Sequence, residues 1–220
     1  MENILNLKSI HCYILNEYSI VLESSQPVHF SFQQKLWWIT ENISLNSNII
    51  DVIIGMNNLT VVLNPTNESP SNFLPKLEML WQQAQLKEFK SREILIPVKY
   101  GNQYGPDLNF IAQNSKLSID EVINIHSNTE YLVYFLGFQP GFAYLEGLSP
   151  ILATPRRESP RFSVPAGSVG IGGNLTGIYP QKTPGGWNII GQTNLTLFNP
   201  NHFPPTLLQP GDKVRFIPDN

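Results

Sequence analysis

Cysteine is almost absent from this sequence, and so are long apolar runs. The chain contains one cysteine, Cys12, which excludes an intrachain disulfide and a multi-cysteine metal site. Its four histidines show no paired ligand spacing such as H-x-x-x-H, so no zinc site is evident. No stretch reaches the ~20 apolar residues that a membrane-spanning helix needs, and the strongly apolar segment 131–138 has the length of a strand.

Charged residues are also scarce, and neither sign dominates. They make up 14% of the 220 residues, and the formal net charge is -3. This balance provides no general cationic field for a phosphate backbone, so we expect no nucleic-acid partner. The N-terminal segment lacks a basic start followed by an unbroken apolar run, so we expect no secretory signal, no membrane association and a cytoplasmic location.

Proline and glycine are present in numbers, but they are unevenly distributed. From Gly137 onward lie 12 of the 15 glycines and 12 of the 18 prolines. Because both residues interrupt regular structure, this distribution predicts two architectures in one chain. We expect an α+β domain over residues 1–100, a helical connector over 101–130 and a mainly-β domain over 131–220.

The first hundred residues alternate between strand-like and helix-like patterns. The strands expected there cover 11–15, 19–23, 49–54, 59–63 and 93–99, and the helices cover 32–43 and 74–84. This order contains the split βαβ unit of a ferredoxin-like fold, and the strand at 93–99 is expected to close its sheet.

Beyond residue 100 the pattern changes. Short helices are expected over 108–113 and 119–126, the second because Ser118 and Glu121 form a capping-box pattern. Short apolar runs separated by proline and glycine then predict an irregular β-barrel. Its strands are expected at 132–136, 167–171, 187–191, 195–198 and 214–217.

Ordered sequence blocks in the second half carry the most specific signal. They read YGPDL (104–108), GFQPGFAYLEGL (137–148), TPRRESPR (154–161), VPAGSVGIGG (164–173), TGIYP (176–180) and PGGWNIIG (184–191). In these blocks the chain resembles the family of the B subunit of 5-oxoprolinase. That family includes the Kip-type sporulation kinase inhibitors and is related to the first subunit of allophanate hydrolases and to part of urea carboxylases.

The resemblance implies that the mainly-β domain is a cyclophilin-like barrel. It also implies a subunit that is inactive alone and works with two other proteins. One is the C subunit of 5-oxoprolinase, which resembles allophanate hydrolase subunit 2, and the other is a third, separate subunit. Such a complex opens 5-oxo-L-proline to L-glutamate and uses ATP with Mg at the level of the complex. A physical reason for ATP is that phosphorylating the amide oxygen makes an unstrained lactam a better electrophile for water.

Arg156, Arg157 and Arg161 are the first candidate catalytic residues. Pro155 and Pro160 stiffen this segment, so the three guanidiniums could each donate two parallel hydrogen bonds to a carboxylate or a phosphate. The alternative is that they lie in solvent or pair with acidic side chains of the same barrel. With the family resemblance added, we favour an anion site or a partner interface.

Glycine pairs form a second candidate set, for substrate or anion binding. Gly172, Gly173, Gly185 and Gly186 could bring backbone N–H groups close to an anion. No P-loop motif occurs, and turning the corners of a small barrel is the explanation that we favour for these glycines.

Aromatic residues and one histidine complete the candidates. A pocket for a small flat ring could be lined by four aromatic residues, Phe138, Phe142, Tyr144 and Trp187. Such residues more often form barrel core, and we expect Phe138 in the core and Tyr144 facing a cleft. His126 could carry a proton, because the ordinary pKa of histidine lies near neutrality. Its position at the end of a predicted helix equally suits a histidine that fills a junction.

Four positions depart from the pattern of the family. Asn102 and Gln103 stand where a glycine and an acidic residue usually precede GPDL, Leu175 replaces a glutamine and Gln192 replaces an arginine. These changes remove polar and charged groups near the expected cleft, so they bear on catalytic competence more than on membership of the family.

Several functions follow from these features. A subunit of an ATP-dependent 5-oxoprolinase is the first, and an inhibitor that binds a sensor histidine kinase through the barrel is the second. A subunit of an allophanate hydrolase or urea carboxylase-like complex is a further alternative. The hypothesis of a prolyl isomerase is based on the expected barrel fold alone. Because a fold does not by itself imply a function, we expect no such activity.

Overall fold

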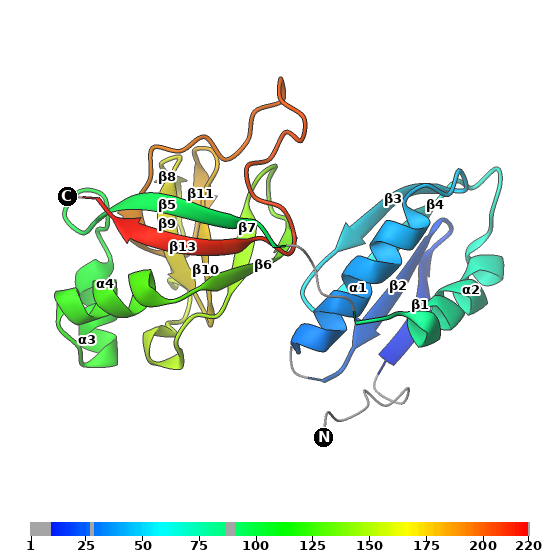
Figure 1. Cartoon of the computed structure of the whole chain (residues 1–220), viewed down its shortest axis with the longest axis horizontal. Helices are drawn as coiled ribbons and strands as arrows, with labels where there is room; N and C mark the ends of the chain where they lie inside the picture. The colour runs from blue at the N-terminus through cyan, green and yellow to red at the C-terminus, as the bar shows by residue number, and fades with distance from the viewer. Residues whose placement is uncertain (1–9, 27–28, 87–90, 220) are drawn as a thin grey trace. The chain divides into compact units, whose positions relative to one another are not determined.

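The chain folds into two units, each with a large hydrophobic core of its own. Figure 1 shows the ribbon of the whole chain. The structure is a computed structural model, described for residues 10–26, 29–86 and 91–219. It divides into a first unit, Met1–Phe89, and a second unit, Lys90–Asn220. Within the described residues, no helix is long and apolar enough to cross a membrane.

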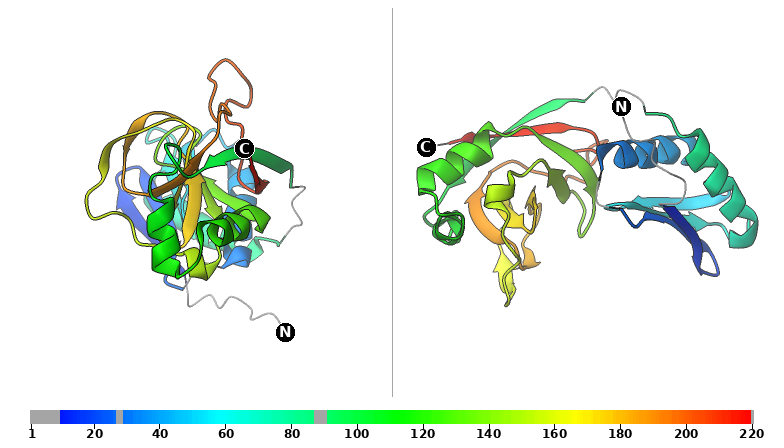
Figure 2. Two further views of the ribbon diagram at one scale, coloured as in Figure 1. Left: turned by 90° about the vertical axis from the view of Figure 1, so that its left-hand side faces the viewer. Right: turned by 90° about the horizontal axis from the view of Figure 1, so that it is seen from below.

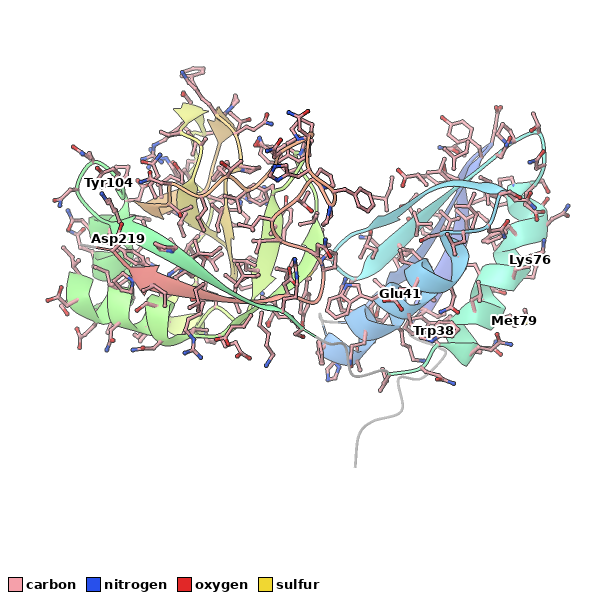
Figure 3. All side chains as sticks on the ribbon, turned by 45° about the horizontal axis from the view of Figure 1, so that its top comes forward. Trp38, Glu41, Lys76, Met79, Tyr104 and Asp219 are labelled. Atoms are coloured by element: carbon pink, nitrogen blue, oxygen red, sulfur yellow. The ribbon has the colours of Figure 1, made fainter. Side chains whose placement is uncertain are left out.

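The first unit is a four-stranded antiparallel sheet in the order β1-β2-β4-β3. Its elements are β1 (Ile10–Asn16), β2 (Ser19–Ser24), α1 (Phe30–Ile43), β3 (Ile49–Ile54), β4 (Asn58–Leu63) and α2 (Pro70–Gln83). Along β4 every second side chain, at Leu59, Val61 and Leu63, is fully buried, because one face of the strand lies in the core. Both helices cover that face (Figure 2), and Lys76 and Met79 lie on the outer side of α2 (Figure 3).

The strand expected to close this sheet belongs elsewhere, so that part of the fold prediction is wrong. β5 (Glu93–Tyr100) lies in the second unit and pairs in parallel with β13 (Lys213–Pro218). In the first unit β1 occupies the edge beside β2, so the sheet lacks the closing strand of the predicted ferredoxin-like order. A local pattern predicts a strand, but it does not specify a partner that lies more than a hundred residues away along the chain.

The second unit is built around a closed barrel in the order β10-β7-β6-β13-β5-β12-β9. Its further elements are α3 (Leu108–Ser115), α4 (Ile119–Asn128), β6 (Tyr131–Leu136), β7 (Ala143–Glu146), a 3-10 turn η2 (Pro150–Leu152), β8 (Arg161–Val164), β9 (Ser168–Gly172), β10 (Leu175–Ile178), β11 (Thr183–Gly185) and β12 (Asn188–Gln192). β8 and β11 pair with each other as a separate two-stranded sheet.

The helices α3 and α4 pack together beside the barrel (Figure 1). Their residues Leu108, Ile111 and Val122 belong to the barrel core, so the segment expected as a connector is part of the second unit. The predicted capping box is confirmed: Ser118 Oγ accepts the N–H of Glu121, and the Glu121 carboxylate accepts the N–H of Ser118.

The strand pattern of the barrel was predicted only in part. Strands expected near 132–136, 167–171, 187–191 and 214–217 are present, but 195–198 is not a strand and contributes one isolated bridge, Phe198 to Thr206. The segment that contains this bridge, between β12 and β13, extends from the barrel as a long loop (Figure 1). Four short strands were missed: β7, β8, β10 and β11. Each spans three or four residues, which is too few for an alternation of apolar and polar residues to be recognised.

Candidate functional site

A cleft of about 240 Å³ opens in the second unit. Ten described residues line it: Phe138, Phe142, Tyr144, Arg156, Pro160, Tyr179, Pro184, Gly185, Gly186 and Trp187. Aromatic rings therefore make up much of its surface, and Arg156 supplies its one charged side chain. Five of the predicted site residues, Tyr144, Arg156, Gly185, Gly186 and Trp187, come together here.

The floor of the cleft is a small aromatic core separate from the barrel interior. Phe142 is its centre, with ring centroids 5.0 Å from Tyr144, 5.1 Å from Tyr179 and 5.4 Å from Trp187. The rings of Tyr179 and Trp187 meet Phe142 edge-on, at interplanar angles of 81° and 86°. Such edge-to-face pairs add to the stabilisation from burial, so the floor is a preformed apolar surface.

Arg156 stands over this floor, with its guanidinium carbon 6.0 Å from the centroid of the Trp187 ring. This is a cation–π arrangement. Among the described residues Arg156 forms no ion pair, and it is exposed. Its positive charge is therefore available to a ligand in the cleft.

Arg157 and Arg161 differ from Arg156, because both form ion pairs with the same carboxylate. Arg157 Nη1 lies 3.1 Å and Arg161 Nη2 lies 2.7 Å from Oδ1 of Asp107. Oδ2 of Asp107 accepts the backbone N–H of Ile189 at 2.7 Å. The alternative expected for the cluster, pairing with an acidic side chain of the same barrel, is thus the arrangement of these two arginines, while Arg156 remains unpaired.

The positive charge at the cleft affects the pKa values of two tyrosine hydroxyls. Burial raises the pKa of Tyr144, and the charge of Arg156 opposes that rise. Burial likewise raises the pKa of Tyr179, opposed by the backbone N–H of Trp187 and by the charges of Arg156 and Arg161. Both side chains are therefore neutral hydroxyls near neutral pH, suited to hydrogen bonding rather than to proton abstraction.

The four candidate glycines divide into two pairs. Gly172 and Gly173 do not line the cleft: a Cβ on Gly172 would lie 2.6 Å from Trp187 Nε1, and the N–H of Gly173 donates to the carbonyl of Thr154. Gly172 thus makes room for the indole below the cleft. Gly185 and Gly186 do line it, and a Cβ on Gly185 would lie 2.6 Å from the Tyr179 hydroxyl.

His126 lies inside the barrel, fully buried and outside the residues that line the cleft. Its Nε2 is 3.0 Å from Thr176 Oγ1, which donates to the carbonyl of Gly170, so Nε2 carries the proton. Nδ1 then accepts the hydroxyl of Tyr100 at 2.8 Å. Burial lowers the pKa of His126 to about 3, so the ring is a neutral core residue, and the geometry favours the structural explanation.

The prediction that Phe138 belongs to the core is wrong. Its side chain is 61% exposed and lines the cleft, and its φ angle is 66°. The N–H of Gln139 donates to the carbonyl of Gly137 at 2.7 Å and closes a tight turn centred on Phe138, in the loop between β6 and β7. Tyr144 faces the cleft as expected.

Two of the four residues that depart from the family pattern, Leu175 and Gln192, have local partners. Leu175 packs against the aromatic floor, and Gln192 Nε2 donates to the carbonyl of Ala166. Asn102 lies in the turn after β5 with a φ angle of 48°. None of these residues lines the cleft, so the replacements do not change the set of groups that a ligand would meet there.

Asp107 and Tyr179 are the site residues that sequence reasoning did not select. Asp107 lies in the YGPDL block, which sequence analysis singled out only for the family resemblance. Its contact with Arg157 joins residues 50 positions apart, so no local spacing could have revealed it. Among the described residues no group of three or more His, Cys, Asp or Glu side chains could hold a metal ion.

Comparisons with known proteins agree with this architecture. The family model for the carboxyltransferase domain, subdomain C and D, matches residues 10–208. A protein of Escherichia coli O157:H7, named as the B subunit of 5-oxoprolinase, is 46% identical over 96% of this chain and 97% of its own length.

Two solved structures share the fold within longer chains. The crystal structure of TTHA0988 matches with a TM-score of 0.80 and 31% identity over 92% of this chain, which spans 40% of that protein. The Kluyveromyces lactis urea carboxylase matches with a TM-score of 0.80 and 18% identity over 96% of this chain, which spans 22% of that enzyme. The chain therefore belongs to the carboxyltransferase subdomain C and D family, within the group of 5-oxoprolinase B subunits.

Proposed function

We propose that this chain is a subunit of an ATP-dependent 5-oxoprolinase that opens 5-oxo-L-proline to L-glutamate. The observation that carries the proposal is the full-length match, at 46% identity, to a protein named as the B subunit of such an enzyme. In the overall reaction the lactam C–N bond breaks, and water supplies a hydroxyl to the carbonyl carbon and a proton to the nitrogen. The cleft around Arg156 is the part of the reaction site that this chain contributes.

The proposed complex contains a partner of the 5-oxoprolinase C-subunit type and a third protein, and it works in the cytoplasm. The name of the relative, a lettered subunit, supports an assembly of several chains. The cleft on its own holds one charged side chain and no general base, which supports the expectation that this subunit is inactive alone.

ATP with Mg belongs to the complex in this proposal, but the described residues of the cleft and of the 172–173 segment do not fit it. The cleft lining contains no carboxylate that could ligate Mg²⁺. The glycine segment at 172–173 does not present a phosphate cradle, because the Gly173 N–H is bonded to Thr154 and the Trp187 indole fills the space above Gly172.

Reconstitution tests the proposed function. The chain should be purified with its two cognate partner subunits, and glutamate formed from 5-oxo-L-proline should be measured with and without MgATP. We expect glutamate only from the assembled mixture with MgATP. An assembled complex that forms no glutamate would refute the 5-oxoprolinase activity.

A kinase inhibitor is the second candidate, and it would need exposed side chains on the second unit that can contact another protein. Phe162 is 97% exposed and Phe203 is 99% exposed, so both could contact another protein. The test is inhibition of autophosphorylation of a sensor histidine kinase by the full chain. The likeness to urea carboxylase, at 18% identity, concerns the fold, and nothing in the cleft favours that enzyme's chemistry.

A further inference from the structure

The arginine segment has more positive charge than its surroundings neutralise, and the excess faces the cleft. Asp107 pairs with Arg157 and Arg161, which leaves Arg156 without a carboxylate among the described residues. Arg156 lines the cleft and contacts the face of Trp187. A ligand that carries one negative charge would therefore complete this site.

The rest of the cleft specifies what that ligand must look like. Its floor is formed by the closely packed rings of Phe142, Tyr179 and Trp187, and the exposed ring of Phe138 also lines it, so the walls around a ligand are largely apolar. Tyr144 at the side offers a hydroxyl for a carbonyl or amide group. A small, partly apolar ring with one anionic group matches both features.

We propose that this cleft binds the carboxylate of 5-oxo-L-proline through Arg156, with the lactam ring on the aromatic floor, and that the nucleotide is bound outside it. The inference rests on the proposed function, because that function supplies the identity of the acid. It assigns the two ligands of the reaction to different places in the complex.

The volume of the cleft and its few donor groups suit 5-oxo-L-proline and not the nucleotide. The cleft of about 240 Å³ is smaller than the ~300–1,000 Å³ typical of sites for larger ligands. A triphosphate with Mg²⁺ also requires several cationic or backbone N–H donors and acidic metal ligands. Arg156, the one charged side chain in the lining, provides a match for one carboxylate.

Direct binding to the full-length chain is the first test. Titration of 5-oxo-L-proline, followed by the NMR signal of the Trp187 indole, should show saturable binding. The uncharged analogue 5-oxoprolinamide should bind at least about tenfold more weakly, because a hydrogen bond to a charged group contributes ~1.5–3 kcal/mol. Equal affinity for acid and amide, or no response of Trp187, would overturn the proposal.

Substitution of Arg156 gives the matched comparison. Arg156→Gln should weaken 5-oxo-L-proline binding about tenfold or more, and Arg156→Lys should recover part of the loss because it restores the charge without the fork. Arg215→Gln removes the same charge from an exposed position on β13, outside the cleft, and should leave the affinity unchanged. Thermal unfolding of the variants checks that each is folded.

The assembled complex distinguishes this inference from the proposed function. Arg156→Gln should raise the KM for 5-oxo-L-proline about tenfold while the KM for MgATP stays unchanged. A change in the KM for MgATP alone, or displacement of 5-oxo-L-proline from the cleft by MgATP, would overturn the inference and leave the 5-oxoprolinase activity intact. If no complex is active, the activity fails, and the titration still decides whether the cleft binds the acid.

A carboxylate from a partner protein could also meet Arg156. In that case Arg156→Gln would weaken assembly of the complex and leave binding of 5-oxo-L-proline to the full chain unchanged. That outcome would contradict a substrate site in this cleft.

Discussion

Arg161 Nη2 lies 2.7 Å from Oδ1 of Asp107, and this contact ties β8 to the loop that precedes α3. The same oxygen accepts Arg157 Nη1, and the other carboxylate oxygen accepts the N–H of Ile189 at the start of β12. One side chain that is 5% exposed therefore joins three segments around the cleft. Asp107 is a positioning residue: it fixes the arginine segment so that Arg156 remains beside Trp187.

Replacing Asp107 with Asn should destabilise the second unit. Asn retains an oxygen and fits the space, but it leaves the two guanidiniums without a negative charge. Breaking a buried pair costs ~3–5 kcal/mol, and because both arginines are partly exposed we expect about 2 kcal/mol. The measurement is urea unfolding followed by the ¹⁹F signal of fluorotryptophan at Trp187, since the other three tryptophans lie in the first unit.

Glu158 provides the control for this substitution. It is an exposed acid in the same arginine segment, and it forms no described ion pair. Glu158→Gln should change the free energy of unfolding by less than about 0.5 kcal/mol. Equal stability of the Asp107→Asn variant and the original chain would show that the pair does not hold the segment.

Local sequence signals predicted local structure well. The hairpin of β1 and β2, the helices α1 and α2 and the capping box of α4 each depend on residues close in the chain, and each is present. The sheet that β5 joins depends instead on its pairing with β13, near the other end of the chain. Barrel closure decides that pairing, and no feature inside residues 93–100 specifies it.

The candidate site shows the same division. Tyr144, Arg156 and Trp187 were selected from blocks of sequence, and they meet in one cleft. His126 was selected for its chemistry, but its environment is set by Tyr100, Thr176 and Phe216, which come from three distant strands. Phe138 was assigned to the core from its apolar ring, although its place in the sequence GFQPG favours a turn that exposes it.

Gly172 should not tolerate a side chain. A Cβ at this position would lie 2.6 Å from Trp187 Cε2 and Nε1, so Gly172→Ala must displace the indole. Overpacking of this kind costs ~1–3 kcal/mol, and displacement of Trp187 should also weaken ligand binding in the cleft. Urea unfolding and the Trp187 signal measure the two effects.

Gly186→Ala is the matched control, because its Cβ would meet Pro160 at an ordinary distance of 3.8 Å. We expect its stability within about 0.5 kcal/mol of the original chain. If Gly172→Ala behaves like Gly186→Ala, the indole has more freedom than its packing indicates.

Phe203 should contribute to association with a partner protein and not to the stability of the fold. The side chain is 99% exposed, so Phe203→Ser removes almost no buried apolar surface and should change the free energy of unfolding by less than about 0.5 kcal/mol. If the projecting loop contacts a partner protein, the same variant should weaken co-purification of the complex. Phe216→Ser, at a fully buried position, should instead unfold the barrel, which separates the two roles.

His126 should make the second unit sensitive to acid. Its pKa is lowered by burial to about 3 in the folded chain, against 6.5 for an ordinary histidine. Between these two values the unfolded chain binds a proton that the folded chain does not. The free energy of unfolding should therefore fall as the pH decreases below 6.5, and the contribution of this histidine should be complete and constant above it.

Comparison with a residue that does not titrate isolates this effect. His126→Gln can still accept from Tyr100 and donate to Thr176, but it binds no proton. Between pH 7.5 and 5.5 the original chain should lose about 1.4 kcal/mol more than the variant, which corresponds to one pH unit below the unfolded pKa. Urea unfolding at both pH values, followed at Trp187, gives the two losses. Equal losses would mean that the imidazole keeps its ordinary pKa in the folded barrel, which its burial and its contacts with Thr176 and Phe216 argue against.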